Sequence, residues 1–234
     1  MRVALCLFLV ACHSNAPVAP PPKVVPVAQP ASHFGFYLLA MMWSQPTCSL
    51  KLHGLWPNFT DEQSQGQPRA WPQFCGGYAH CEQAEDASCA PTAPVPAELA
   101  PLAPDYVHGT LATHEWSKHG SCTALSAMDY FAAENSAIHL VHHDALKPGD
   151  YAPADVQRVF GIAAESVVLG CNDHCELTQV GFCLAKDAGD HPTGATPCTQ
   201  NVTTSDYDNG CVTKHCVKIS VPACPSSTAN ASGG

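Results

Sequence analysis

A nearly continuous apolar run over residues 34–43 predicts a buried β-strand. The run ends before Pro46, and its lack of alternation is typical of a strand that is covered on both faces. Residues 51–55 predict a second, shorter strand. Alternating apolar and polar positions predict three more strands, over residues 166–169, 176–184 and 211–219.

Helical spacing of apolar positions begins near the middle of the chain. Residues 110–119 predict a helix that stops at Gly120. Ser126 is a candidate N-cap for a longer helix that runs to about residue 141. Residues 153–160 predict a third helix, because their apolar side chains share one face.

The region before these helices is different in character. Residues 60–110 are rich in Gly, Pro and Gln, which indicates loops with one short helix around residues 96–102. Strands and helices are therefore segregated along the chain rather than strictly alternating. This order predicts a loop-rich α+β fold, with a central antiparallel β-sheet flanked by helices, in one domain over residues 33–224.

The two ends of the chain lack such patterns. Residues 1–12 have a positive start and a short apolar stretch, as a signal peptide does, and they end in the lipobox-like Leu9-Val10-Ala11-Cys12. Cys12 is therefore a candidate for lipidation, and cleavage after Ala16 is the alternative. Residues 13–32 form a Pro-rich linker, and the polar residues 225–234 are expected to be a disordered tail.

The composition is acidic. Ten Lys and Arg stand against twenty Asp and Glu in 234 residues, a formal net charge of −10. No run of Lys or Arg occurs, which excludes a polybasic surface that holds nucleic acid through many phosphate contacts. Any engagement of a phosphate group has to depend on a local site.

One segment with candidate chemistry is Leu52-His53-Gly54-Leu55-Trp56-Pro57-Asn58. Gly54 leaves the backbone beside His53 open to close approach, and Trp56 offers a flat face on which a base can stack. A histidine beside glycine and tryptophan is also common in a purely structural role. This segment is therefore informative only together with a second one.

The second segment is His114-Glu115-Trp116-Ser117-Lys118-His119-Gly120-Ser121-Cys122. On a helix, Glu115, Lys118 and His119 are spaced i, i+3, i+4 and share one face, with His114 at its edge. The alternative is a solvated helix face with an ordinary Glu–Lys pair. Because the whole chain has only ten Lys and Arg, a lysine between two histidines favours a functional role.

A zinc hydrolase is a further alternative. The helix of zinc proteases carries two histidines at i and i+4. His114 and His119 are five residues apart, which turns their side chains roughly 140° from each other on an ideal helix. We therefore expect no metal site here and no cofactor.

Two histidines from different segments can instead support metal-free phosphoryl transfer on RNA. One imidazole removes the proton of a 2′-OH, and the other protonates the departing 5′-oxygen. Lys118 and a protonated His114 would stabilise the charge that builds on the phosphorane oxygens. The RNA supplies its own nucleophile, so a Ser or Cys nucleophile is not needed.

The blocks HGLWPN (53–58) and HEWSKHGSC (114–122) resemble the two signature segments of the ribonuclease T2 family, in the same order. The strand before Pro46 and Cys48 resembles the family's first strand, and residues 104–109 resemble mainly its bacterial periplasmic members. In outline the resemblance covers roughly residues 34–220, but only the two blocks are specific.

The resemblance implies roles for the residues of both blocks. His53 and His119 would be the acid–base pair, with His119 as base and His53 as acid in the cyclising step. The sequence alone does not determine which of the two histidines is the acid and which is the base. His114, Glu115 and Lys118 would bind the phosphate and stabilise its transition state. A base-stacking pocket would contain Trp56, with Asn58 and Phe59 as further candidates.

The cysteine content indicates disulfides and export. Of fourteen cysteines, Cys6 and Cys12 fall in the leader, and the remaining twelve allow six bridges whose connectivity spacing alone does not determine. The resemblance implies two of the pairings, Cys48 with Cys75 or Cys81, and Cys122 with Cys89.

Together these features predict a metal-independent endoribonuclease. It would cleave single-stranded RNA with broad base tolerance, through 2′,3′-cyclic phosphate ends to 3′-phosphates, and DNA would resist because it lacks the 2′-OH. We expect an exported monomer in a bacterial periplasm or outer envelope, with a lipid anchor at Cys12, or alternatively a secreted protein. The main alternative function is that of a catalytically silent envelope binding protein on the same scaffold.

Overall fold

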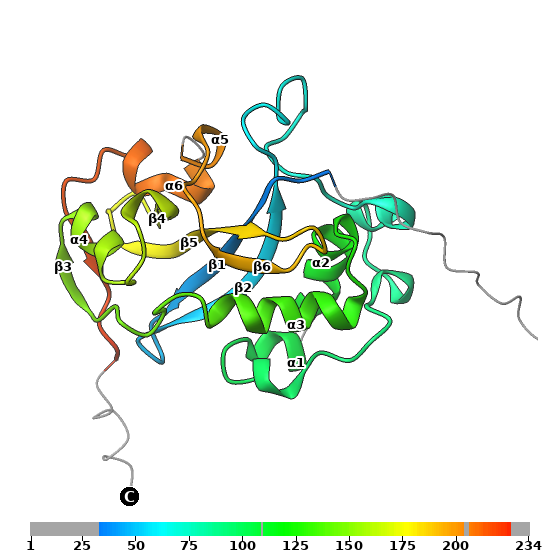
Figure 1. The fold of residues 1–234 in the computed structure, drawn as a ribbon. Coiled ribbons are helices and arrows are strands. Elements are labelled where there is room, and N and C mark those ends of the chain that lie inside the picture. The colour runs from blue at the N-terminus through cyan, green and yellow to red at the C-terminus, as the bar shows by residue number, and fades with distance from the viewer. Residues whose placement is uncertain (1–32, 109, 204–205, 226–234) are drawn as a thin grey trace, which may run out of the picture.

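The predicted apolar strand lies at the centre of the fold (Figure 1). In the computed structural model, which describes residues 33–108, 110–203 and 206–225, this segment is β1 (Phe36–Ser44). It pairs with β2 (Ser49–Asn58) on one side and with β5 (Leu177–Lys186) on the other, both antiparallel. Beyond β5 the sheet continues into β4 (Val167–Cys171), and β6 (Pro192–Ala195) pairs with one end of β5.

Burial on both faces explains the unbroken apolar run of β1. Tyr37, Leu39 and Met41 belong to the larger hydrophobic cluster on one face of the sheet, and Leu38 and Ala40 belong to a smaller cluster on the other. All five side chains are fully buried. The α+β fold with a central antiparallel sheet is therefore confirmed.

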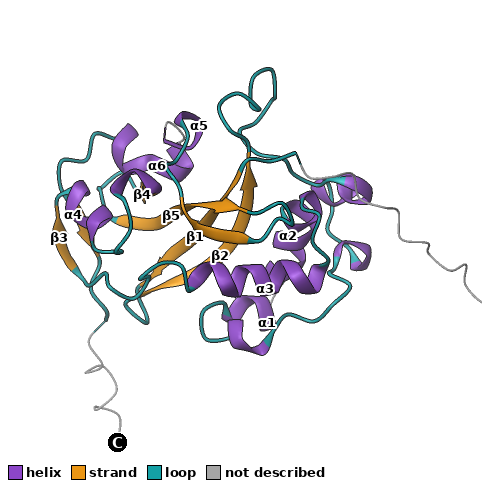
Figure 2. Cartoon of the chain, viewed as in Figure 1, coloured by secondary structure: helices purple, strands orange, loops and turns teal. Residues whose placement is uncertain are grey.

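Helices α1 (Pro104–His108), α2 (Leu111–Lys118) and α3 (Ala127–Ile138) contribute to the larger cluster (Figure 2). The predicted helix over residues 110–119 corresponds to α2. The hydroxyl of Ser126 accepts a hydrogen bond from the Asp129 N–H at 3.2 Å, so the predicted N-cap of α3 is confirmed. Tyr130 and Phe131 of α3 are fully buried in the cluster.

The remaining elements lie toward the other end of the sheet. The predicted third helix is α4 (Pro153–Arg158), and the last helices are α5 (Gln200–Thr203) and α6 (Asp206–Thr213). Strands β3 (Gly149–Tyr151) and β7 (Ile219–Val221) form a separate antiparallel pair. The loop-rich region carries short 3-10 turns at Gly76–Glu82, Ala87–Cys89 and Ala97–Leu99.

The predicted strand over residues 211–219 is wrong. This segment contains the end of α6 and only the first residue of β7. Its buried positions do not alternate, and they include Cys211 and Cys216, which are joined to Cys171 and Cys175. Disulfides, rather than the expected β-sheet hydrogen bonds, hold the segment next to β4. His215 turns the chain with a φ of 56°.

Six disulfides are present among the described residues, as the cysteine count predicted. They join Cys48 to Cys224, Cys75 to Cys122, Cys81 to Cys89, Cys171 to Cys211, Cys175 to Cys216, and Cys183 to Cys198. The two pairings expected from the family resemblance are therefore wrong for this chain.

Backbone contacts explain the pairings that occur. The N–H of Phe74 donates to the carbonyl of Lys118 at 2.9 Å, which places Cys75 beside Cys122 at the end of α2, with Cα atoms 4.9 Å apart. Cys81 is left to close a short loop with Cys89. Cys48, in the turn between β1 and β2, bonds instead to Cys224 near the end of the described chain.

Some expectations concern parts of the chain outside the described residues. These are the leader with Cys12, the linker over residues 13–32, and the tail beyond residue 225. Within the described ranges, none of the helices has the length and apolar character that crossing a membrane requires.

Candidate active site

The two histidine-containing segments meet where β2 and α2 pack together. His53 lies on β2, and Glu115 lies on the face of α2 that is turned toward it. A Cβ atom placed on Gly54 would lie 2.0 Å from Oε2 of Glu115 and 2.6 Å from Nε1 of Trp56. Glycine at this position therefore lets β2 and α2 approach closely. The Glu115 side chain occupies the space that a Cβ atom would need.

A pocket of about 240 Å³ opens at this junction. The expected catalytic residues all line it, together with two of the three expected base-site residues and one tryptophan that the sequence analysis did not select. The lining residues are His53, Trp56, Asn58, Trp71, His114, Glu115, Lys118 and His119.

Trp56 contacts both central histidines. Its ring stacks on His119 with centroids 5.1 Å apart and planes at 20°, and it meets His53 edge to face at the same centroid distance. The indole Nε1–H donates to Oε2 of Glu115 at 2.7 Å. Trp56 is only 8% exposed, so it helps to fix the positions of three polar side chains.

His53, whose side chain is 20% exposed, pairs with the buried Glu115, with 3.5 Å between Nε2 of His53 and Oε1 of Glu115. Burial raises the pKa of Glu115 to about 8, and the hydrogen bond from Trp56 and the charge of Lys118 offset part of that rise. Burial also lowers the pKa of His53 to about 4, with the charges of His114 and Lys118 adding to the effect. At neutral pH the pair therefore holds its proton on the Glu115 carboxyl group, beside a neutral His53 imidazole.

His119 follows α2 as its C-cap residue, and its N–H donates to the carbonyl of Glu115 at 3.0 Å. The side chain is 3% exposed, and burial, followed by the charges of Lys118, His114 and His53, lowers its pKa well below the ordinary value. Its buried Nδ1 has no hydrogen-bond partner among the described residues. A neutral imidazole with an uncompensated ring nitrogen is suited to accept a proton.

Lys118 and His114 also line this pocket, and both are partly exposed. Nδ1 of His114 lies 2.6 Å from Oε1 of Glu85, which comes from the loop between Cys81 and Cys89. The arrangement places the neutral imidazoles of His53 and His119 in one pocket with the ammonium group of Lys118. Such a pocket can transfer protons and bind an anion such as a phosphate group.

The ribonuclease T2 family model matches residues 34–191, a range that contains both histidine segments and the whole pocket. The chain belongs to the ribonuclease T2 family.

Individual relatives agree with this assignment. The chain is 28% identical over 116 residues to intracellular ribonuclease LX of Solanum lycopersicum and 30% identical over 114 residues to a ribonuclease of Aeromonas hydrophila. These alignments cover 46% and 43% of this chain, and 45% and 43% of those relatives. The chain thus matches less than half the length of either relative.

The fold agrees as well. The crystal structure of Actibind, a T2 ribonuclease, superposes with a TM-score of 0.54 at 18% identity, and the alignment covers 92% of this chain and 98% of that one. A self-incompatibility ribonuclease of Nicotiana alata gives a TM-score of 0.51 at 15% identity, with 72% and 94% covered. At these identities the likeness concerns the T2 fold alone.

In this T2 family member, the expected base-site residues do not all reach the pocket. Asn58 is 1% exposed, and its Nδ2 donates to the carbonyl of Trp56 at 3.0 Å while its Oδ1 has no partner among the described residues. Phe59 is partly buried but does not line the pocket; its N–H donates to the carbonyl of Ala70 at 2.9 Å. That hydrogen bond brings the next residue, Trp71, to the pocket wall.

Trp71, Glu85 and Glu134 are the site residues that sequence reasoning missed. Trp71 and Glu85 lie in the loop-rich region, where no periodicity indicates which side chains face the pocket. Glu134 is fully buried on α3, and its Oε1 accepts the N–H of Leu55 at 3.3 Å. Glu134 falls within the helix predicted to run from Ser126 to about residue 141, but that position does not by itself distinguish a buried carboxyl group from an exposed one.

Glu134 belongs to a network that holds β2 behind the pocket. The Tyr106 hydroxyl lies 2.8 Å from the carbonyl oxygen of His53 and 3.0 Å from Oε1 of Glu134. The Tyr130 hydroxyl donates to the carbonyl of Leu55 at 2.9 Å. Helices α1 and α3 therefore fix the backbone that carries His53.

Proposed function

We propose that this protein is an endoribonuclease that needs no metal ion and cleaves single-stranded RNA by transphosphorylation. The observation that carries the proposal is that His53 and His119 both contact Trp56 and line one pocket, together with Glu115 and Lys118. Membership of the ribonuclease T2 family supports ribonuclease activity in general.

In the first step, His119 removes the proton of the RNA 2′-OH, and the 2′-oxygen attacks the adjacent phosphorus. The P–O5′ bond breaks, and the departing 5′-oxygen takes a proton from His53. The products are a 2′,3′-cyclic phosphate and a free 5′-OH. Burial lowers the pKa of His119, so the imidazole is in the neutral form that a general base requires.

His53 has to be protonated for this step, whereas burial leaves it neutral. Glu115 supplies the proton in our proposal. An anionic phosphate in the pocket favours the imidazolium form of His53, and the Glu115 carboxyl group, which holds a proton up to about pH 8, lies 3.5 Å away. The carboxylate left behind then stabilises the imidazolium.

The second, slower step hydrolyses the cyclic phosphate to a 3′-phosphate. The roles reverse: His53 takes a proton from water, the water oxygen attacks phosphorus, and His119 returns a proton to the departing 2′-oxygen. In both steps His114 and Lys118 stabilise the charge on the non-bridging oxygens.

The aromatic residues of the pocket wall support the proposal of broad base tolerance. Trp56, Trp71 and Asn58 line the pocket, and stacking on an aromatic face accepts every base. Phe59 stays a weaker candidate at the edge. The acidic protein, with its net charge of −10, is expected to bind RNA weakly away from the scissile phosphate and with a shallow salt dependence.

The six disulfides support an exported protein. We propose that it works as a monomer in a bacterial periplasm or outer envelope, anchored through Cys12, with secretion as the alternative. Mass spectrometry of the mature N-terminus checks this: an acylated Cys12 is expected, and an unmodified start at Pro17 would remove the anchor from the proposal.

The test of the activity uses a defined single-stranded RNA in the presence of EDTA, with product ends identified by mass spectrometry. We expect cyclic phosphate ends that convert to 3′-phosphates, no cleavage when the scissile nucleotide is 2′-deoxy, and near-complete loss in His53→Ala and His119→Ala. Loss of cleavage in EDTA would indicate a metal hydrolase. Absence of cleavage by the intact chain would favour a binding protein.

A further inference from the structure

A contact at the edge of the pocket has no part in the reaction described above. Nδ1 of His114 lies 2.6 Å from Oε1 of Glu85, a strong imidazole–carboxylate hydrogen bond. The His114 side chain is 37% exposed and that of Glu85 is 28% exposed. The pair is therefore accessible to a substrate while it is partly shielded from water.

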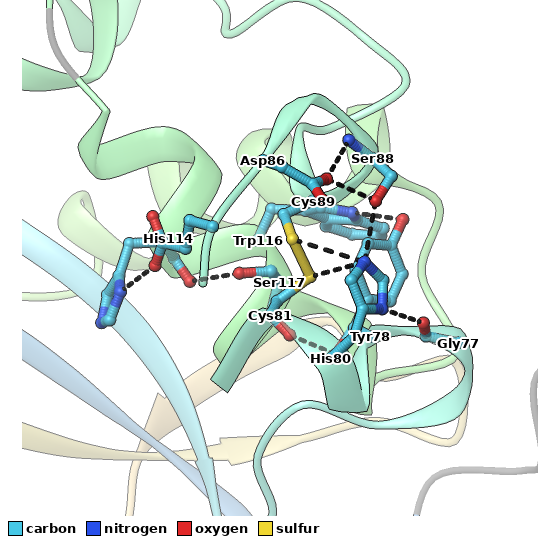
Figure 3. The surroundings of a disulfide bond; sticks show 12 residues. Gly77, Tyr78, His80, Cys81, Asp86, Ser88, Cys89, His114, Trp116 and Ser117 are labelled. Atoms are coloured by element: carbon cyan, nitrogen blue, oxygen red, sulfur yellow. Dashed lines mark hydrogen bonds and ion pairs between the residues drawn. A yellow bond between two sulfur atoms is a disulfide. The ribbon is translucent and has the colours of Figure 1, made fainter. Parts of the chain in front are cut away.

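Glu85 comes from a loop that covalent and hydrogen bonds hold in place. The disulfide between Cys81 and Cys89 closes the loop, and both cysteines are buried. Asp86 accepts hydrogen bonds from the N–H and the hydroxyl of Ser88, at 2.7 and 2.6 Å. Figure 3 shows this disulfide with Asp86 and Ser88 on one side and His114 on the neighbouring helix.

A second histidine, His80, contacts residues of this loop and does not line the pocket. His80 places Nε2 2.7 Å from the Ser88 hydroxyl and 3.4 Å from Sγ of Cys81 (Figure 3). His80, Cys81 and Cys89 bring three potential metal ligands within 4.8 Å, but the two sulfur atoms are joined to each other and are not available as thiolates. The function of this cluster is to hold the loop, and with it Glu85, against α2.

We propose that Glu85 is a positioning residue that holds His114 for phosphate binding. By accepting the Nδ1–H, the carboxylate fixes the orientation of the ring and leaves Nε2 as the nitrogen that meets the ligand. It also compensates the positive charge when Nε2 carries a proton and donates to a phosphate oxygen. The inference deepens the proposed function and rests on it, since it assigns His114 to a phosphate group.

The charge of Glu85 has a second effect on the pocket. It contributes to the raised pKa of Glu115, after the larger effect of burial. Loss of this charge therefore weakens phosphate binding through His114 and lowers the pKa of the Glu115 carboxyl group. The weaker phosphate binding is the change that distinguishes the two roles, because a merely structural contact on the loop would leave it unchanged.

The test compares Glu85→Gln and Glu85→Ala with Glu82→Gln as the matched control. Glu82 is on the same segment and is 46% exposed; it contacts Arg69 and Gln73, so its substitution removes the same charge away from His114. For a dinucleoside monophosphate, we expect KM to rise about tenfold in Glu85→Ala and less in Glu85→Gln, which retains an acceptor oxygen. The kcat value should change less than KM, and Glu82→Gln should match the wild type.

Two measurements do not depend on cleavage. The ¹⁵N shifts of the His114 ring should show a proton on Nδ1 in the wild type and a mixture of tautomers in Glu85→Ala. Titration with inorganic phosphate should show binding that weakens about tenfold in Glu85→Ala. Unchanged ring shifts, or equal weakening in Glu82→Gln, would overturn the role of Glu85. If the wild type binds phosphate at His114 but cleaves no RNA, the proposed function fails and the role of Glu85 stands.

Discussion

The indole of Trp56 stacks on the imidazole of His119, with ring centroids 5.1 Å apart and planes at 20°. The same indole donates its N–H to Glu115 at 2.7 Å. One side chain thus contacts the proposed base and also lowers the proton affinity that burial gives to the carboxyl group beside the proposed acid.

Trp56→Phe separates these two effects. The phenyl ring retains an aromatic contact with His119, but Glu115 loses a hydrogen bond that lowers its pKa. We expect kcat to fall about tenfold and the alkaline limb of the pH–rate profile, which loss of the Glu115 proton governs, to move to higher pH. Trp56→Ala should lose far more activity. An alkaline limb that stays in place in Trp56→Phe would contradict the assignment.

Gly54→Ala should disable the site by steric conflict. The added Cβ would lie 2.0 Å from Oε2 of Glu115, so the carboxyl group or the strand has to shift. We expect activity to fall at least about a hundredfold and unfolding to become easier by about 1–3 kcal/mol. Gly194→Ala on β6 is the control, because nothing lies within 4 Å of its Cβ. Comparable activity in both variants would show that the close approach at Gly54 is not required.

Glu134 makes stability depend on pH. Burial raises its pKa well above the ordinary value of 4.5, so the folded protein keeps a proton that the unfolded chain releases. Stability is therefore lost as pH rises from about 4.5 toward the raised pKa. His53 acts in the opposite sense: its pKa falls from 6.5 to about 4, so stability increases with pH across that window.

Comparing the wild type with Glu134→Gln above pH 6.5 isolates the carboxyl group, because the histidine contribution, which fades over the next pH unit, is common to both proteins. Urea unfolding between pH 6.5 and 8 should show a loss of up to about 1.4 kcal/mol per pH unit for each buried carboxyl group. Glu134→Gln should reduce that slope, and Glu98→Gln, at an exposed position, should not. Equal slopes in the wild type and Glu134→Gln would refute a retained proton on Glu134.

Opening the loop that carries Glu85 should reproduce the loss of Glu85. The double variant Cys81→Ala, Cys89→Ala is expected to raise KM as Glu85→Ala does and to lower stability by about 2–3 kcal/mol. Cys183→Ala, Cys198→Ala removes a disulfide with a sequence separation of 15, between residues that do not line the pocket. This control should destabilise the protein but leave KM unchanged. A normal KM in Cys81→Ala, Cys89→Ala would rule out the role of the loop.

Local patterns in the sequence determined much of the fold. The apolar run of β1 and the Ser126 cap of α3 carry their own signals, because burial on both faces and backbone capping depend on residues close together in the chain. The same holds for the spacing that places Glu115, Lys118 and His119 on one face. The two histidine segments were therefore recognisable before any contact between them was known.

Tertiary structure alone decided which distant residues meet. The pairing of Cys75 with Cys122 depends on a hydrogen bond between Phe74 and Lys118, and Trp71 reaches the pocket because Phe59 pairs with Ala70. Glu85 contacts His114 across 29 positions of the sequence. Such contacts lie in loops, where no period in the sequence records which way a side chain points. They also set the proton affinities of the site, because burial and neighbouring charges exist only after the chain has folded.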